Sequence, residues 1–372
     1  MTMTLTVPCL FGLESLVADE MKRLSLREVR AENGRVHCLG SEADIPRLNL
    51  NLRCGARVLM ELGSFPAATF DQLFEGVRAL PWEDYIPRDG EFPVKGYTLN
   101  SILHSVPACQ AIVKKASAKR LGQSYGVETL PETGSRYQIQ FSIIKDVATL
   151  YLDTSGDGLY KRGYRARNMG APLRETLAAA LVTLSRYRSR DPFCDPFCGS
   201  GTIPIEAALI AKNRAPGLDR SFSAQRWKTL PSRLWTDAAQ EAMDREFHGA
   251  YDIWGGDIDP AAVELARHNA ELAGVDDCVR FEVADAAAFR RDSEYGQLVT
   301  NPPYGERLME RSEAEALYRM FGKALLTLPP KWRVVVLSSH TEFERSFGRP
   351  ALKKRKLYNG MIKCDAFFYG GK

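Results

Sequence analysis

The second half of the chain alternates between short apolar runs and segments with helical periodicity. The clearest run is Trp332–Ser338, which is almost continuously apolar, as a central strand of a parallel sheet must be. Shorter runs of this kind lie at residues 251–257, 279–283 and 297–300. This alternation predicts an α/β fold whose seven-stranded, doubly wound sheet begins near residue 160 and ends in an edge hairpin around Asn359-Gly360.

The first half predicts smaller α/β units. Residues 1–50 predict strand, helix and strand, with a hairpin turn at Asn33-Gly34, because Asn-Gly suits the positive φ angles of a two-residue turn. Between residues 53 and 155, a strand at Val94–Tyr97 precedes a helical segment, and Ser142–Asp153 predicts a hairpin. Periodicity alone supports only a small mixed domain in this region.

A glycine-containing loop, here named the glycine loop, follows the first predicted strand of the larger sheet. It comprises Asp195, Pro196, Phe197, Cys198, Gly199, Ser200, Gly201 and Thr202. Glycines let the backbone approach a ligand closely, and the start of the following helix supplies unpaired N–H groups. Neither the three-glycine dinucleotide pattern nor the Gly-Lys-Ser/Thr phosphate loop is present, which disfavours a pyrophosphate ligand. The acidic Asp195 instead suits a ligand with a positively charged end, such as the amino group of S-adenosylmethionine.

Carboxylates end the next two predicted strands. Asp257, followed by Ile258, stands at the tip of the second strand, where a carboxylate can accept both hydroxyls of a ribose. Asp259 precedes a proline and is expected mainly to cap the following helix. Asp285, followed by Ala286, ends the third strand and could accept from the adenine amino group of a cofactor. We therefore expect both strand ends to contribute to the cofactor site.

The segment Asn301-Pro302-Pro303-Tyr304, here named the acceptor turn, should lie at the carboxyl edge of the sheet, where open α/β folds bind ligands. The Asn301 side-chain oxygen and the Pro302 carbonyl can each accept a hydrogen bond, which suits an exocyclic amine of adenine or guanine. Tyr304 offers a flat surface on which the base can stack. The alternative is an ordinary proline turn after a strand. We expect all four residues to be catalytic, with Asn301 also beside the cofactor.

These motifs together resemble a known group of enzymes. The order of Asp195–Thr202, Asp257, Asp285 and the acceptor turn is similar to that of class I S-adenosylmethionine-dependent amino-methyltransferases. Further matches are found at Lys161–Arg165, Ala171–Leu181, Asn301–Leu308 and Lys356–Cys364. They resemble THUMP-containing RNA methyltransferases, in particular the guanine-N2 unit of bacterial large-subunit rRNA enzymes of the RlmL type. The resemblance covers essentially the full chain and is most specific in its catalytic half.

The resemblance implies a domain order and a function. It implies a ferredoxin-like region at residues 1–52, completed by part of 150–165, a THUMP RNA-binding domain at 53–155 and a Rossmann-like methyltransferase domain at 160–372. The implied cofactor is S-adenosylmethionine. The implied partner is structured RNA, with the exocyclic N2 of a guanine in 23S rRNA as the methyl acceptor. Guanine rather than adenine rests on the resemblance alone, because both bases offer the same amine.

Three other functions remain open from the sequence. A DNA adenine-N6 methyltransferase would share the chemistry of the acceptor turn but would need a domain that reads duplex bases. A tRNA guanine-N2 methyltransferase would share both the chemistry and the THUMP domain. A non-catalytic RNA-binding assembly factor would be expected to have a damaged glycine loop or acceptor turn, whereas both are intact.

Composition is consistent with a large cytoplasmic enzyme. The chain has 372 residues, and its apolar fraction of 45% is enough for two or three packed domains. There is no run of about 18 apolar residues and no secretion-signal pattern at the start of the chain, so we expect no membrane association. The eight cysteines include no C-x-x-C pair, which favours a reduced protein without a metal site.

Net charge is only +4, so the distribution of basic residues matters more than their sum. Clusters occur at Lys161, Arg162, Arg165, Arg167 and Arg174, at Arg186, Arg188 and Arg190, at Lys114, Lys115, Lys119 and Arg120, and at Lys353–Lys356. Together they favour contacts with phosphates. An insertion at residues 213–250 mixes basic residues with Trp227 and Trp235. It either stacks on splayed-out RNA or forms a helical cover over the sheet with both tryptophans buried.

Overall fold

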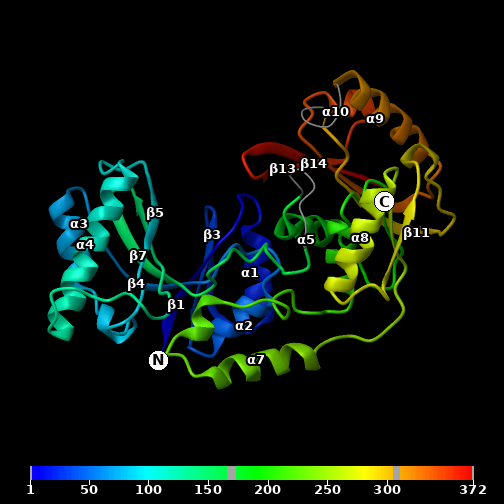
Figure 1. Ribbon diagram of the computed structural model, residues 1–372. Coiled ribbons are helices and arrows are strands. Elements are labelled where there is room, and N and C mark those ends of the chain that lie inside the picture. The colour runs from blue at the N-terminus through cyan, green and yellow to red at the C-terminus, as the bar shows by residue number, and fades with distance from the viewer. Residues whose placement is uncertain (1, 166–172, 305–310, 371–372) are drawn as a thin grey trace.

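The computed structural model describes residues 2–165, 173–304 and 311–370, which form two sheets of seven strands each (Figure 1). Arg167, residues 171–172 and residues 305–308, which the sequence analysis used, lie outside the described residues. Figure 1 shows the first sheet in the N-terminal half and the second sheet in the C-terminal half of the molecule.

The first sheet has the strand order β2-β3-β1-β4-β7-β6-β5. Its strands are β1 (Met3–Pro8), β2 (Arg27–Glu32), β3 (Arg35–Gly40), β4 (Leu59–Pro66), β5 (Val94–Leu99), β6 (Ile139–Ile144) and β7 (Val147–Asp153). The helices of this half are α1 (Glu14–Arg23), α2 (Asp44–Asn51), α3 (Phe70–Ala79), α4 (Val106–Tyr125) and the short 3₁₀ helix η1 (Trp82–Asp84). Strand β4 pairs with both β1 and β7, so the two small α/β units share one continuous sheet.

Both hairpins predicted in this half are present. Strands β2 and β3 pair across Asn33-Gly34, and Gly34 has the positive φ of +75° that the turn requires. Strands β6 and β7 pair across Lys145 and Asp146, whose φ angles of +51° and +61° fit a two-residue type I′ turn. The turn chemistry therefore fixes the register of both strand pairs next to the turns, although the β2–β3 register shifts further along, between Arg27 and Arg30. The sequence analysis did not anticipate α2.

The second sheet has the strand order β10-β9-β8-β11-β12-β14-β13. Its strands are β8 (Phe193–Asp195), β9 (Ile253–Asp257), β10 (Val279–Val283), β11 (Tyr295–Thr300), β12 (Lys331–Ser338), β13 (Lys353–Asn359) and β14 (Ile362–Gly370). Strands β8 to β12 are parallel, whereas β14 runs antiparallel to β12 and forms the predicted edge hairpin with β13. The chain order reverses between β8 and β11, which makes their carboxyl ends the topological switch point of the sheet.

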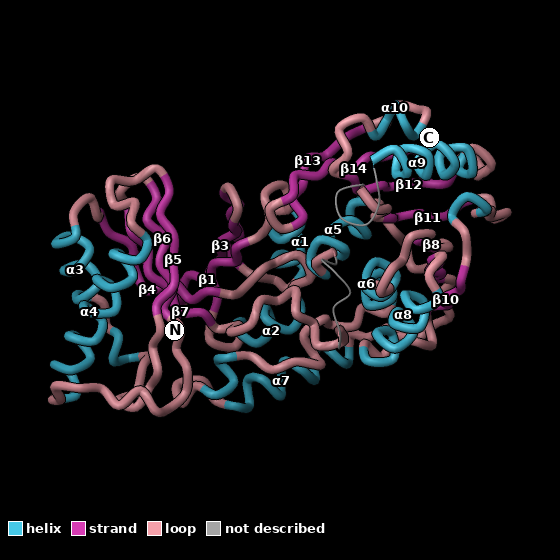
Figure 2. Tube along the Cα trace, turned by 45° about the horizontal axis from the view of Figure 1, so that its top comes forward, coloured by secondary structure: helices cyan, strands magenta, loops and turns pink. Residues whose placement is uncertain are grey.

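Helices cover both faces of this sheet, as Figure 2 shows. They are α5 (Glu175–Leu184), α6 (Thr202–Ala211), α8 (Pro260–Leu272), α9 (Arg311–Leu325), α10 (Phe343–Phe347) and η3 (Ala286–Ala288), whereas η2 (Ser223–Arg226) and α7 (Ser232–Asp244) belong to the insertion. Successive residues of β11 and β12 point to opposite faces, so Leu298 and Val334 join one apolar core while Val299 joins the other. Burial on both faces explains the continuous apolar runs in the sequence.

The insertion between α6 and β9 packs against the N-terminal half. Trp227 and Trp235 are 3% and 5% exposed, so the predicted burial of both tryptophans is confirmed and their stacking on RNA is excluded. The Trp227 ring stacks on Tyr137 with centroids 4.9 Å apart, and its indole N–H donates to the Arg136 carbonyl at 2.9 Å. Helix α7 lies along α2, where Arg47 pairs with Glu241 at 2.8 Å (Figures 1 and 2). Of the two alternatives for the insertion, the one with both tryptophans buried is therefore correct, but α7 packs on α2 of the N-terminal half and not on the catalytic sheet.

Candidate active site at the switch point

Asp195 ends strand β8 in a fully buried position. Its Oδ1 accepts hydrogen bonds from the Thr300 hydroxyl at 2.6 Å and from the Phe197 N–H at 3.1 Å. Its Oδ2 is buried and has no hydrogen-bond partner among the described residues. Burial is the main reason why the pKa of Asp195 rises to about 7, and the nearby Asp257 adds to this rise. A buried acceptor without a partner costs free energy, which indicates that a donor from outside the chain completes this site.

The glycine loop places backbone N–H groups at the start of α6. Gly201 is the N-cap of α6 with a φ of +82°, and a side chain there would come within 2.9 Å of Ala266 and Phe281. Gly199 has a φ of +51°, and a side chain at this position would meet nothing within 4 Å. Gly201 is therefore required by packing as well as by backbone conformation, whereas Gly199 faces open space that a ligand can use.

The loop is tied to β9 through its backbone. The Cys198 N–H donates to the Gly256 carbonyl and the Gly199 N–H donates to Asp257 Oδ2, both at 2.9 Å. The second oxygen of Asp257 accepts from the Asp259 N–H at 3.1 Å. These bonds fix the Asp257 carboxylate at the tip of β9, with remaining lone pairs available for hydroxyl donors.

The neighbouring predicted residues lie at the same edge. Ile258 is 71% exposed, so its apolar surface is free to contact a ligand. The Asp259 side chain accepts from the Ala261 N–H at 2.9 Å and caps α8, which confirms its predicted structural role. Asp285 accepts from the Ala287 N–H at 2.8 Å and caps η3. Asp285 is thus also a helix cap in the structure.

The acceptor turn follows β11 directly and is held by two tyrosines. The Tyr318 hydroxyl of α9 donates to the Pro303 carbonyl at 2.6 Å. The Tyr304 hydroxyl donates to the Asn301 side-chain oxygen. An amide oxygen has two lone pairs, so this bond leaves one of them for an incoming amine. The turn brings together all four predicted residues next to the Asp195 loop, because Thr300 precedes Asn301 in the chain and contacts Asp195.

Sequence reasoning missed two residues that support the glycine loop. One is Thr300. The other is Arg165, whose guanidinium donates to the Thr202 hydroxyl at 2.7 Å and lies 3.5 Å from Glu175. The signal for Arg165 was present in the matched motif Lys161–Arg165, but the basic cluster was assigned to phosphate contacts.

The assignment to phosphate contacts was wrong for two of the basic residues, Arg162 and Arg165. Arg162 is 3% exposed and pairs with Glu206 at 3.4 Å inside the protein. Arg165 is likewise turned inward toward Glu175. Intramolecular ion pairs also engage Lys161, Lys114 and Arg120, with Asp157, Glu132 and Glu83 as their partners. Arg162 and Arg165 are therefore not free to bind phosphates, whereas the side chains of Lys161, Lys114 and Arg120 remain 55%, 35% and 36% exposed, and their phosphate contacts stay a prediction.

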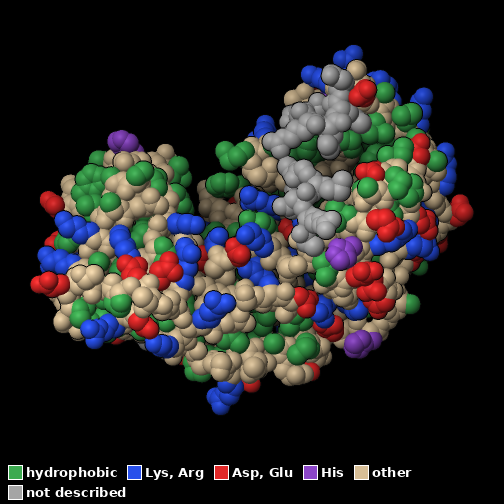
Figure 3. Space-filling model, in the orientation of Figure 1, with side chains coloured by type: hydrophobic (Ala, Val, Ile, Leu, Met, Phe, Trp, Pro, Cys, Tyr) green, Lys and Arg blue, Asp and Glu red, His purple; other side chains and the backbone are tan. Residues whose placement is uncertain are grey.

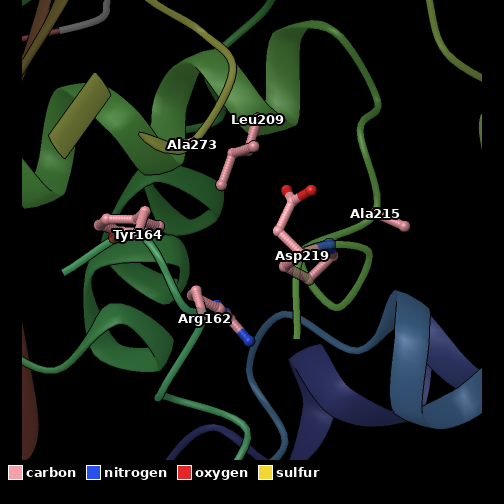
Figure 4. A pocket seen from close by; sticks show the side chains of 7 residues that line it. Arg162, Tyr164, Leu209, Ala215, Asp219 and Ala273 are labelled. Carbon is pink, nitrogen blue, oxygen red and sulfur yellow. The ribbon is translucent and has the colours of Figure 1, made fainter. Parts of the chain in front are cut away.

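A small void lies beside Arg162, remote from the switch point. It has a volume of about 10 Å³ and is lined by Arg162, Tyr164, Leu209, Ala215, Pro216, Asp219 and Ala273 (Figure 4). Leu209 belongs to the carboxyl-terminal half of α6, opposite the end that carries the glycine loop. This void is too small for an organic ligand, and residues of the catalytic domain and of the insertion both line it.

Two classes of feature are absent from the described residues. Within residues 2–165, 173–304 and 311–370, no group of three or more His, Cys, Asp or Glu side chains could hold a metal ion. No helix in the described part of the chain is long and apolar enough to cross a membrane.

The fold defines a class I S-adenosylmethionine-dependent methyltransferase. The family model for the RMKL-like methyltransferase domain matches residues 162–367. Models for the RlmL ferredoxin-like domain and the THUMP domain match residues 4–59 and 67–153. The chain therefore belongs to the RMKL-like methyltransferase family, and it carries an RlmL-type ferredoxin-like domain and a THUMP domain ahead of the catalytic domain.

Two curated proteins illustrate the relationship. The chain is 44% identical to the putative RNA methyltransferase YpsC of Bacillus subtilis, over 100% of this chain and 96% of that protein. It is 35% identical to the ribosomal RNA large subunit methyltransferase K/L of Syntrophotalea carbinolica, over 95% of this chain. The chain spans about half the length of that second protein, 51% of it.

Solved structures agree with the fold. A possible methylase from Clostridium difficile is 42% identical, with a TM-score of 0.95 and coverage of 100% of this chain and 99% of that one. SMU.472, a putative methyltransferase complexed with SAH, is 40% identical, with a TM-score of 0.93 and coverage of 100% and 98%. A predicted N6-adenine-specific DNA methylase from Listeria monocytogenes is 46% identical, with a TM-score of 0.94 and coverage of 100% and 97%.

Proposed function

We propose that this methyltransferase acts on RNA and methylates the exocyclic amine of a purine, namely N2 of a guanine in 23S rRNA. The observation that carries the proposal is the junction between the glycine loop and the acceptor turn. The Thr300 hydroxyl bonds to Asp195 at 2.6 Å, and Asn301 is the next residue. A group that accepts an amine thus lies directly beside a group that accepts a cation.

The residues at the switch point fit S-adenosylmethionine. The unpartnered Oδ2 of Asp195 is suited to the ammonium group, and the open space at Gly199 allows close approach of the ligand. Asp257 would accept the ribose hydroxyls, Ile258 would cover one face of the adenine, and Asp285 would accept from the adenine amine. The remaining loop residues, Pro196, Phe197, Cys198, Ser200, Gly201 and Thr202, would shape the wall of this site. When bound, S-adenosylmethionine supplies an electrophilic methyl group on a sulfonium.

The acceptor turn would orient and activate the amine. The exocyclic nitrogen of guanine is a poor nucleophile because its lone pair is delocalised into the ring. Asn301 and the Pro302 carbonyl would accept its two N–H groups and stabilise the positive charge that develops on nitrogen. Tyr304 would stack on the extruded base and thereby offset part of the few kcal/mol that unstacking costs. Pro303 would keep the turn rigid, supported by the bond from Tyr318.

Two further observations support RNA as the substrate class. The chain has a THUMP domain, and its curated relatives are named as RNA methyltransferases, one of them for large-subunit ribosomal RNA. The name of the Listeria relative favours a second candidate function, adenine-N6 methylation of DNA. Both candidates use the same acceptor turn, so only the product can distinguish them. A tRNA guanine would use the same site as an rRNA guanine.

The test is methyl transfer from labelled S-adenosylmethionine to RNA from cells that lack the enzyme, with genomic DNA in parallel and nucleoside analysis of the product. We expect label in N2-methylguanosine of the 23S rRNA and none after Asn301→Ala. Label in tRNA or in N6-methyladenine of DNA would contradict the substrate assignment but keep the chemistry. Binding of S-adenosylmethionine without any transfer would instead favour a non-catalytic RNA-binding factor.

A further inference from the structure

The edge hairpin β13–β14 extends beyond the catalytic sheet on the side of the acceptor turn. The last residue of β12, Ser338, pairs with Asp365 of β14, and β14 begins three residues earlier, at Ile362. The turn of the hairpin, Gly360-Met361, therefore lies about 14 Å past the end of β12, at about 3.4 Å per residue. Strand β11, which leads into the acceptor turn, is two strand spacings from β14, or about 10 Å.

The tip of this hairpin displays one large apolar side chain. Met361 is 98% exposed, so the protein leaves it without apolar neighbours. It occupies the second position of a two-residue turn whose first position, Gly360, has a φ of +65°. Such a short turn is rigid, so the position of Met361 is fixed by the strands below it.

The base of the hairpin is braced by the N-terminal half. The Arg355 guanidinium donates to the Gly12 carbonyl, and a side chain at Gly12 would come within 3.2 Å of the Lys356 carbonyl. The Glu14 carboxylate accepts from the Gly12 N–H at 2.9 Å and from the Gly34 N–H at 3.0 Å, which fixes the loop that Arg355 contacts. The hairpin is thus held by two domains at once.

Unpaired cations line the hairpin: Lys363 lies two residues from Met361, and Lys356 lies further down, opposite Asp365. Lys356 and Lys363 are exposed and make no ion pair with any described residue, in contrast to Lys161, Lys114 and Arg120. Figure 3 shows a hollow between the THUMP domain and the rest of the molecule. In the same orientation, Figure 1 shows the tip of the hairpin at the border of this hollow. Exposed lysines on the edge strand β13 disfavour pairing with a protein strand and favour a phosphate backbone.

We propose that Met361 is a wedge that enters a base-paired RNA helix next to the target nucleotide and keeps the target extruded, while Lys363 near the tip and Lys356 further down the hairpin hold phosphates of the same RNA. Apolar side chains inserted between base steps unstack them, and methionine is among the residues that do so. This inference rests on the proposed function, because it concerns access of the same acceptor turn to a base within a duplex.

The test compares the initial rate of methyl transfer to a 23S rRNA transcript folded with magnesium with the rate on the same transcript after heating without magnesium. For Met361→Ala we expect the folded-to-unfolded rate ratio to fall at least tenfold. Met361→Leu should restore most of it. The matched control is Met243→Ala, since Met243 is also exposed, at 46%, but lies on α7. Its ratio should equal that of the wild type.

The outcomes separate the two proposals. If the wild type methylates both RNA forms and Met361→Ala keeps the wild-type ratio, the wedge is excluded and the proposed function stands. If the wild type methylates neither form, the proposed function fails, and the wedge proposal, which rests on it, fails as well. In the double variant Lys356→Gln/Lys363→Gln, we expect weaker binding to both RNA forms and a salt slope reduced by about two. An unchanged slope would exclude the phosphate contacts.

Discussion

The hydroxyl of Thr300 donates a 2.6 Å hydrogen bond to the buried carboxylate of Asp195, across the switch point of the catalytic sheet. The two residues are 105 positions apart in the sequence and end neighbouring strands. This bond fixes the Asp195 carboxylate and, through the chain, the start of the acceptor turn. Under the proposed function, it would couple the position of the cofactor to that of the methyl acceptor.

Removing this hydrogen bond should weaken cofactor binding. Thr300→Val keeps the shape of the side chain but leaves Asp195 Oδ1 with one partner fewer, and a buried bond to a charged group is worth about 1.5–3 kcal/mol. We expect S-adenosylhomocysteine affinity, measured by calorimetry, to fall roughly tenfold or more. The control is Thr183→Val, because the Thr183 hydroxyl bonds only to the Ala179 carbonyl within α5. Equal affinity in both variants would contradict the coupling.

Cofactor affinity should depend on pH below neutrality. The pKa of Asp195 is raised to about 7, so the carboxyl is protonated below that pH and cannot pair with an ammonium group. We expect affinity for S-adenosylhomocysteine to fall roughly tenfold between pH 7 and pH 5.5, with proton release on binding near pH 7. Thr300→Val should move the fall to higher pH, because the Thr300 bond lowers the pKa of Asp195.

The same shift predicts a trade-off between stability and binding. A carboxyl whose folded pKa lies above its ordinary value of 3.8 stabilises the folded protein most at low pH, and this contribution is lost as pH rises through about 7. Asp195→Asn removes the buried charge. We expect it to melt at a higher temperature than the wild type at pH 8, to bind the cofactor weakly and to show a flat pH profile. A lower melting temperature would indicate that the charge is compensated within the protein.

Tyr304 should act mainly through its ring. Loss of a stacking partner costs about 1–3 kcal/mol per base, so Tyr304→Ala should lower kcat/KM for RNA about 10- to 100-fold. Tyr304→Phe loses only the hydroxyl that donates to Asn301 and should be affected far less. Cofactor affinity serves as the control measurement. Equal losses in the two variants would show that the hydroxyl, and not the ring, is the functional group.

The buried pair Arg162–Glu206 should matter for stability and not for RNA binding. Both side chains are at most 3% exposed, and removal of one partner leaves an uncompensated buried charge that costs about 3–5 kcal/mol. We expect Arg162→Met to lower the free energy of unfolding by that amount in urea titrations, and Arg162→Met/Glu206→Met to recover part of it. The salt dependence of RNA binding should stay that of the wild type. A smaller salt dependence of RNA binding for Arg162→Met than for the wild type would show that Arg162 contacts phosphates.

Much of the fold was predictable because its signals are local. Apolar runs identified the parallel strands, and Asn33-Gly34 and Lys145-Asp146 identified two hairpin turns. The helix cap at Asp259 followed from an aspartate before a proline. By contrast, helix α2 was missed, because eight residues that include a proline carry a weak periodic signal.

The sequence by itself determined the order of motifs and their chemistry: a glycine loop after a carboxylate, carboxylates at two strand tips and two acceptors in a proline turn. Only the tertiary structure decided which side chains meet. It paired Thr300 with Asp195, turned Arg162 and Arg165 inward and packed Trp227 against Tyr137. Local patterns report the preferred backbone conformation of a segment. Whether a charge pairs inside the protein or faces solvent depends on partners that are distant in sequence, and the chain brings them together only when it folds.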